Sequence, residues 1–235
     1  MTPALSGIRI LDFTHFVAGP WATSLLADFG ADVIKVEDPG GGDGSRQLDS
    51  AFGPGMSSYF VGMNRGKRSI ALDLKSARGR AVIDRLLQDT DVVIANFRPG
   101  VMDRLGFGYE QLAARNPRLL YVSITAFGER GPLAKEPAMD IIVQAAGGVM
   151  GLTGEPGRAP LKVGAPVADF AGSYIAFSAI SLALYVRERQ GIGQKIEINL
   201  LDGQVSMLAN FMTGHALSGH PEGPQGGGHP QIVPY

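Results

Sequence analysis

From residue 8 to residue 37 the chain reads IRILDFTHFVAGPWATSLLADFGADVIKVE. Residues 8–13 form a short run rich in aliphatic side chains, which predicts a strand, and residues 21–29 place apolar side chains at helical spacing. Asp32–Glu37 predicts a second strand. This succession of strand, helix and strand is typical of a parallel sheet with crossover helices.

The same alternation continues along most of the chain. Further strands are predicted at 69–74, 91–97, 119–125 and 194–199, and further helices at 77–88, 101–105, 109–115, 140–149, 169–189 and 201–217. The predicted fold class is therefore α/β, with a Rossmann-like parallel sheet flanked by helices.

Two segments interrupt this rhythm. Residues 39–58 are rich in glycine and have no apolar period, so they predict a long loop of the kind that often carries function. Residues 219–235 are dominated by Gly, Pro and His, and they predict a flexible linker. We expect residues 1–218 to form the N-terminal part of a large domain, and residues 219–235 to lead to a small domain that the chain does not contain.

Composition excludes several classes of protein. Across 235 residues the formal net charge is −1, which gives no reason to expect a nucleic-acid partner. The chain has no cysteine, so disulfides and thiolate metal sites are excluded. Charged side chains within the first 20 residues argue against a signal peptide. The apolar run at 174–186 is too short for a convincing membrane span. These features predict a soluble, cytoplasmic protein without a membrane partner.

Several familiar motifs are missing. The turn after the first predicted strand, residues 15–20, lacks the G-x-G-x-x-G of dinucleotide-binding folds. The chain has neither G-x-S-x-G nor H-E-x-x-H. The four histidines lack the spacing of metal ligands, so no metal site is predicted.

Basic residues gather in two places. The run NRGKR at 64–68, with Lys75 beyond the next strand, indicates either a solvated turn, which is the commoner case, or a phosphate-binding cluster that flanks a groove. The run NFRPG at 96–100, with Arg104, follows a predicted buried strand. Ligands of open α/β sheets bind beyond the carboxyl ends of strands, so this second cluster favours a binding site. The Phe97 ring can either stack on a flat ring of a ligand or pack in the hydrophobic core, which is the commoner case.

The segment VGAPVADF at 163–170 places Asp169 at the start of a predicted long helix. An aspartate there can cap the helix by accepting an orphan backbone N–H. The same carboxylate can also act as a nucleophile in covalent catalysis.

The sequence resembles the class III CoA-transferases, the family that includes formyl-CoA transferase, carnitine CoA-transferase and α-methylacyl-CoA racemase. The matching stretches run in order along nearly the whole chain: LSGIRILDFTHFVAGP, LLADFGADVIKVEDPGGGD, NRGKRSIALDLK, NFRPGVMDRLGF, NPRLLYVSITAFGERGP, GAPVADFAGS and GQKIEINLLDG. Each motif is weak by itself, but together they are highly specific.

The resemblance implies an acyl-CoA:carboxylic acid CoA-transferase that forms an interlocked homodimer. CoA and acyl-CoA would be substrates, and no permanently bound cofactor is expected. Asp169 matches the catalytic aspartate, which would form a mixed anhydride and then an aspartyl-CoA thioester. The positions that match CoA contacts are Phe16, Val17, Leu72, Asp73, Leu74, Lys75, Asn96, Phe97, Arg98 and Arg104. Asp38 stands where formyl-CoA transferase has a nucleotide-binding arginine. Candidate oxyanion donors are the backbone N–H groups of Gly147, Gly148 and residues 226–228.

Three alternatives stay open at this point. A racemase of the same family would use a histidine as its second base, but Met139 stands at that position, and a thioether cannot exchange a proton near neutral pH. Asp140, which follows it, is expected to be structural. Because family members extend well past the position of Tyr235, a non-catalytic truncated member is the second alternative. An NAD(P)-dependent oxidoreductase is the third, and the missing glycine motif counts against it.

Overall fold

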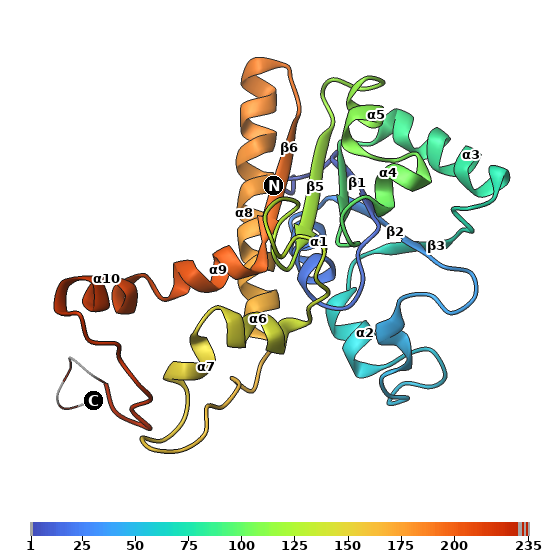
Figure 1. Cartoon of the computed structure of the whole chain (residues 1–235). Coiled ribbons are helices and arrows are strands. Elements are labelled where there is room, and N and C mark those ends of the chain that lie inside the picture. Colours follow the sequence, from blue (N-terminus) through green and yellow to red (C-terminus); the bar gives the residue numbers. More distant parts are fainter. Residues whose placement is uncertain (1, 230–231, 233, 235) are drawn as a thin grey trace. The chain divides into compact units, whose positions relative to one another are not determined.

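The computed structural model describes residues 2–229, 232 and 234. Six strands form one parallel sheet in the order β3-β2-β1-β4-β5-β6 (Figure 1). The strands are β1 (Arg9–Asp12), β2 (Asp32–Glu37), β3 (Arg68–Ala71), β4 (Val92–Ala95), β5 (Leu120–Thr125) and β6 (Gln194–Asn199). This is the order of the Rossmann fold, so the predicted fold class is confirmed.

The chain divides into two compact units. The first comprises Met1–Thr125 and Gly172–Ile198, and the second comprises Ala126–Ala171 and Asn199–Tyr235. The segment expected to be a linker, residues 219–235, belongs to the second unit, and its residues 230, 231, 233 and 235 lie outside the described residues.

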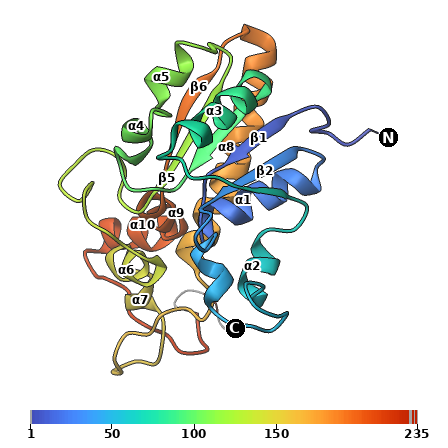
Figure 2. The same cartoon turned by 90° about the vertical axis from the view of Figure 1, so that its right-hand side faces the viewer.

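In the first unit, helices cover both faces of the sheet (Figure 2). The helices α3 (Ala77–Leu86), α4 (Val101–Leu105) and α5 (Tyr109–Ala113) lie on one face. On that face Leu11 and Val93 join a buried cluster with Ile83 of α3 and Leu112 of α5. Their neighbours along the strands, such as Ile10, are also fully buried, because alternate side chains point to the opposite face.

The opposite face is covered by α1 (Ala18–Asp28) and by the part of α8 (Val167–Gln190) that belongs to the first unit. Ser173 Oγ donates to the carbonyl of Ala18 at 2.7 Å, which joins the two helices. Arg187 binds Asp91 at 2.8 Å and ties the far end of α8 to the start of β4. By length and composition alone α8 could span a membrane. Its buried Ala176, Ile180 and Ala183, among others, are what a helix packed on a sheet also requires.

The second unit contains α6 (Asp140–Ala146), α7 (Val149–Leu152), the first turn of α8, α9 (Leu200–Met207) and α10 (Ala209–Ser218). Two predicted helices are each broken into two. The helix expected at 140–149 breaks at Gly148, whose φ of 89° is outside the helical region. The helix expected at 201–217 breaks at Leu208.

The segment from residue 39 to residue 63 is more ordered than the sequence pattern indicates. It contains the short 3-10 helix η1 (Gly44–Gln47) and the helix α2 (Ser58–Met63), neither of which was predicted. The hydroxyl of Ser57 accepts the backbone N–H of Phe60 at 2.9 Å, so Ser57 is the N-cap of α2. Another short 3-10 helix, η2 (Leu87–Asp89), ends the helical segment predicted at 77–88.

Candidate active site

The residues predicted to contact CoA follow three strands of the first unit. Phe16 and Val17 follow β1, Leu72 to Lys75 follow β3, and Asn96 to Arg98 follow β4. The register shows that β1 pairs in parallel with both β2 and β4, and that β2 pairs in parallel with β3. The three segments therefore leave the sheet at its carboxyl edge, where open α/β folds bind their ligands.

The turn after β1 has a strained backbone. Phe16 has a φ of 63°. Among the residues that the structure describes, no other non-glycine residue has a positive φ. Its backbone N–H donates to Asp43 Oδ1 at 3.2 Å. A β-carbon on Gly19 would lie 2.2 Å from the Thr14 side chain, so only glycine fits where the turn enters α1. Strained residues of this kind cluster at ligand-binding loops, where the surrounding structure holds them in place.

Asn96 holds this turn from the neighbouring strand. The backbone N–H of His15 donates to Asn96 Oδ1, and Asn96 Nδ2 donates to the His15 carbonyl, each at 2.8 Å. Phe97 packs against the core cluster, and its ring centroid lies 5.3 Å from that of His15. Burial lowers the pKa of His15, although the Asp43 carboxylate opposes the shift. Asn96 and Phe97 thus shape the first turn and join two of the predicted CoA-binding segments.

The segment after β3 also combines packing with exposed polar groups. Leu72 and Leu74 pack against the core cluster. Asp73 Oδ1 accepts the backbone N–H of Lys75 at 2.9 Å, which closes the turn before α3. The Lys75 side chain is exposed, and it forms no ion pair with a described residue.

Arg98 and Arg104 are exposed as well, and neither pairs with an acidic side chain in the part of the chain that the structure describes. Gly100, with a φ of 78°, starts α4, and a β-carbon there would lie 3.2 Å from Arg104 Nη1. The N–H donors of both guanidinium groups are therefore available to bind an anion. The function of the ten predicted contact residues stays a prediction.

The NRGKR run is a turn in which Arg65 and Arg68 are exposed, but the Lys67 side chain is buried. Lys67 Nζ is buried and donates to Asp12 Oδ2 at 2.9 Å, to the Pro20 carbonyl at 2.9 Å and to Asn64 Oδ1 at 2.8 Å. Arg65 pairs with Asp28 and lies over the Trp21 ring. The expectation that Lys67 lines a phosphate groove is therefore wrong, because its charge is buried and paired with Asp12. Arg65 is 40% exposed beside Asp28, so its part in a phosphate groove stays a prediction.

Lys67 belongs to a buried network of charges that sequence reasoning missed. Lys35 Nζ binds Asp43 Oδ2 at 2.9 Å and donates to the Thr14 carbonyl at 2.6 Å. Burial raises the pKa of Asp12, but the ammonium groups of Lys67 and Lys35 and two threonine hydroxyls bring it below its ordinary value. Burial lowers the pKa of Lys67 to about 8. The available signal was a charged side chain inside each apolar run, Asp12 in ILDF and Lys35 in VIKV.

Asp169 lies in the first turn of α8, in the second unit. The capping role that its position suggested belongs to another residue. Asp140 Oδ1 accepts the backbone N–H groups of Ala168 at 2.8 Å and Asp169 at 3.2 Å. Asp140 thereby satisfies two of the N–H groups that a helix start leaves without partners. The Asp169 carboxyl group is not the acceptor of these bonds.

The Asp169 carboxyl group has an unusual acidity. Burial, followed by the negative charge of Asp140, raises the pKa of Asp169 to about 7. Both causes disfavour the ionised form, the first by removing water and the second by repulsion. A carboxyl group perturbed in this way at a helix start is a candidate for catalysis, because it titrates near neutral pH.

Most of the glycines proposed as oxyanion donors use their N–H groups within the chain. Gly147 donates to the Val143 carbonyl at 2.8 Å and Gly148 donates to Ala145 at 3.3 Å. Gly226 donates to the Gly154 carbonyl and Gly228 to the Gln225 carbonyl, each at 2.9 Å. The expectation that these four N–H groups are oxyanion donors is wrong in this conformation, because each already donates to a carbonyl of the chain. Gly147 has a packing role instead, since a β-carbon there would lie 2.7 Å from Gln204 Cβ.

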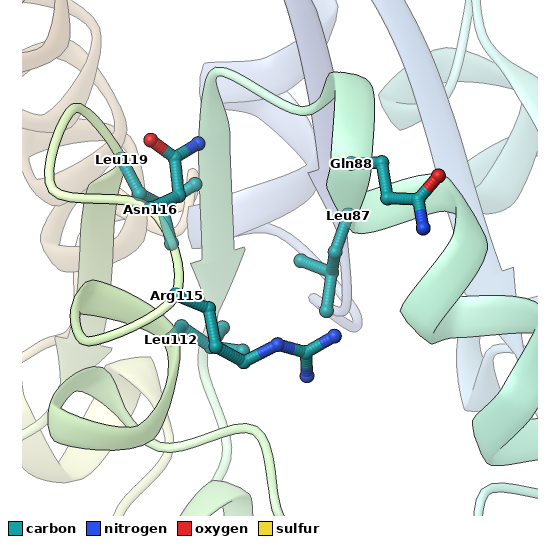
Figure 3. A pocket seen from close by; sticks show the side chains of 6 residues that line it. All are labelled: Leu87, Gln88, Leu112, Arg115, Asn116 and Leu119. Carbon is teal, nitrogen blue, oxygen red and sulfur yellow. The ribbon is translucent and has the colours of Figure 1, made fainter.

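A pocket of about 340 Å³ is formed by the six residues labelled in Figure 3, at the amino ends of β4 and β5 and therefore opposite the predicted CoA contacts. It is lined by Leu87, Gln88, Leu112, Arg115, Asn116 and Leu119, which precede β4 and β5. Arg115 Nη1 binds Asp84 at 2.7 Å, and Asn116 Oδ1 accepts the N–H of Arg118 at 3.0 Å. Because its charged group is already paired, this pocket is a poor site for an anion. Among the described residues, no cluster of acidic and imidazole side chains could hold a metal ion.

Comparisons with known proteins agree on one family. The family model described as CoA-transferase family III matches residues 5–235. The chain is 46% identical to a succinate–glutarate CoA-transferase of Agrobacterium fabrum, over 99% of this chain and 60% of that protein. It is 44% identical to an acetyl-CoA:oxalate CoA-transferase of Acetobacter aceti, over 97% of this chain and 59% of that protein.

A solved structure gives the same result for the fold. A CaiB/BaiF family protein from Brucella suis superposes with a TM-score of 0.94 at 42% identity, covering 100% of this chain and 63% of that one. The chain therefore spans about 60% of the length of the curated relatives it matches.

Proposed function

We propose that this chain, which belongs to CoA-transferase family III, is the nucleotide-binding and nucleophile-bearing part of an enzyme that moves CoA between carboxylic acids. The observation that carries the proposal is the place of Asp169 in the first turn of α8, where Asp140 performs the capping and where burial and the Asp140 charge raise the pKa of the Asp169 carboxyl group to about 7. The names of the two relatives contain succinate, glutarate and oxalate, so we propose short dicarboxylic acids as substrates.

The carboxyl edge of the sheet is the proposed place for the CoA nucleotide. Lys75, Arg98 and Arg104 have no acidic partner among the described residues, and they follow strands of one parallel sheet. Charge-assisted hydrogen bonds from such groups match the oxygens of phosphates. The strained Phe16 exposes its ring at the same edge of the sheet and supplies apolar surface there, whereas Val17 is buried in the core.

The proposed reaction proceeds in four displacements on Asp169. One carboxylate oxygen of Asp169 attacks the acyl carbon of the thioester, the C–S bond breaks, and CoA leaves as the thiolate with the bonding pair. The thiolate then attacks the aspartyl carbonyl carbon of the mixed anhydride. The C–O bond to the acyl group breaks, the first acid leaves as a carboxylate, and Asp169 holds CoA as a thioester. No proton or external reductant is required.

The second half of the reaction repeats these steps with the acceptor. The acceptor carboxylate attacks the aspartyl thioester carbon and releases CoA thiolate, which forms a second mixed anhydride. The thiolate attacks the acceptor acyl carbon, and the new acyl-CoA leaves while the Asp169 carboxylate is restored. Removing water from Asp169 raises its pKa and its nucleophilicity together, and a closed site protects both intermediates from hydrolysis.

The oligomeric state, the location and the cofactor requirement are proposed from the family resemblance. We propose a homodimer that works in the cytoplasm, with CoA thioesters as substrates and no permanently bound cofactor.

The test is mass spectrometry of the enzyme that contains this chain, after incubation with acyl-CoAs and dicarboxylic acids. We expect a CoA adduct that hydroxylamine removes, located on a peptide containing Asp169. Asp169→Asn should lose both the adduct and turnover, by orders of magnitude. Asp84→Asn, a change at the opposite edge of the sheet, should keep both. Full turnover in Asp169→Asn would contradict the proposed nucleophile.

A further inference from the structure

Gln144 is a buried polar residue of the second unit that the proposed reaction does not use. It lies on α6, one turn after Asp140, and its side chain has no exposed surface. A buried amide must find partners for its donors and its acceptor, because each group left without one is costly. The partners of Gln144 therefore show what the residue is for.

Both ends of the Gln144 amide are engaged. Its Nε2 donates to Asp140 Oδ2 at 2.6 Å and reaches the Ala165 carbonyl at 3.4 Å. Its Oε1 accepts the backbone N–H of Val163 at 2.9 Å. Gln144 thus connects Asp140 with the segment 163–165 that leads into α8.

The two oxygens of Asp140 have different partners. Oδ2 is held by Gln144, and Oδ1 accepts the N–H groups of Ala168 and Asp169. The carboxylate is therefore fixed on both sides. One turn of α6 and the first turn of α8 are held together through this carboxylate.

We infer that Gln144 is a positioning residue for Asp169, acting by holding the Asp140 carboxylate in place against the first turn of α8. This inference rests on the proposed function of Asp169. The charge of Asp140 is, after burial, the second cause of the raised pKa of Asp169. The other charged group of the same segment, Lys162, directs its ammonium to the carbonyls of Val163 and Gly164 at 3.3 and 3.4 Å.

A positioning role and a merely structural role of Gln144 have different effects on the titration of Asp169. Without the Gln144 donor, Asp140 Oδ2 loses the hydrogen bond that fixes it, and the carboxylate is no longer held against the first turn of α8. Its repulsion of Asp169 then weakens, so Asp169 ionises at lower pH. A loss of packing alone would change stability or turnover but would not move this titration.

The chain offers a matched control in Gln204, which is also fully buried in the second unit. Its Nε2 contacts Met207 Sδ at 3.4 Å, and its Oε1 has no hydrogen-bond partner among the described residues. Gln204→Met therefore removes a buried amide without removing a bond to Asp140.

The experiment measures the rate of CoA-adduct formation on Asp169 against pH in the enzyme that contains this chain. In Gln144→Met we expect the midpoint of the acid limb to fall by roughly half a pH unit or more, with CoA affinity unchanged by calorimetry. Gln204→Met should keep the wild-type midpoint. In an Asp140→Asn background Gln144→Met should produce no further shift, because the two residues act in sequence.

The outcomes are distinct. A wild-type enzyme without any adduct would contradict the proposed function. A normal wild-type adduct with an unmoved midpoint in Gln144→Met would overturn the positioning role, and so would an equal shift in the Asp140→Asn background. If Gln144→Met does not fold, Gln144→Leu replaces it, since it is also uncharged and lacks the donor to Asp140. A lowered midpoint in Gln144→Leu supports the inference, and a fixed one overturns it.

Discussion

Asp140 Oδ1 accepts the backbone N–H of Asp169 at 3.2 Å, so one aspartate caps the helix that carries the other. The negative charge that satisfies the helix start also opposes ionisation of the Asp169 side chain. Cap and candidate nucleophile are therefore separate residues, and the cap influences the acidity of the nucleophile.

The first prediction concerns the stability of Asp169→Asn. The pKa of Asp169 is raised from its ordinary value of 3.8 to about 7, so the folded state binds its proton more tightly than the unfolded state. The side chain's contribution to stability is then greatest below pH 4 and falls as pH rises towards 7. We expect Asp169→Asn to melt several degrees above the wild type at pH 8, at about 2–4 °C per kcal/mol. The difference should shrink at pH 5, as measured by calorimetry. A constant difference across this range would contradict the raised pKa.

The second prediction concerns Asp140. Asp140→Asn keeps an oxygen for the N–H groups of Ala168 and Asp169 but removes the charge. The acid limb of the activity profile should move to lower pH, because only burial still raises the pKa of Asp169. Asp140→Ala removes the cap as well, and we expect an additional loss of about 1 kcal/mol in the free energy of unfolding. Equal stability of the two variants would mean that the cap contributes nothing.

The third prediction concerns the buried pair of Asp12 and Lys67, whose charged atoms lie 2.9 Å apart. Lys67→Met leaves a buried carboxylate without its cation and should lower the free energy of unfolding by about 3–5 kcal/mol. The double variant Asp12→Asn, Lys67→Met should recover a large part of this loss, because no unpaired charge is left. Urea denaturation of the four proteins in the cycle gives the coupling energy. Additive single effects would show that the pair does not act as a unit.

The fourth prediction concerns the CoA nucleotide. Arg104→Ala should remove charge-assisted bonds of about 1.5–3 kcal/mol, which is a loss of roughly ten-fold or more in CoA affinity. Added salt should weaken CoA binding to the wild type more than to the variant. Arg115→Ala is the control, because Arg115 belongs to the pocket at the opposite edge and pairs with Asp84. If Arg115→Ala weakens CoA binding as much as Arg104→Ala, the nucleotide site lies elsewhere.

The fifth prediction separates CoA transfer from racemisation. Met139 is 70% exposed at the start of α6, and its thioether cannot exchange a proton near neutral pH. In deuterated water, a 2-methylacyl-CoA incubated with the enzyme should keep its α-proton and its optical activity. Nuclear magnetic resonance detects the exchange directly. Rapid uptake of deuterium at the α-carbon would favour the racemase alternative.

Much of the architecture follows from local patterns. The run DVIKVE predicts β2 with its observed ends, Asp32 and Glu37, because every side chain of a buried strand must suit the core. Breaks within a predicted helix are harder to predict from the sequence. The helix expected at 201–217 separates into two at Leu208, where the sequence has no glycine or proline to mark the end.

By itself, the sequence determined the α/β class, the strands whose carboxyl ends carry the predicted CoA contacts, and the place of Asp169 at a helix start. These properties depend on periodicity and on neighbours along the chain, which a sequence records directly. Only the tertiary structure decided that Asp140 caps α8 from 29 residues away, and that Lys67 pairs with Asp12 across 55 residues. Such pairs depend on which strands and helices pack together, so a local pattern cannot distinguish a buried, paired charge from an exposed one that is able to bind phosphate.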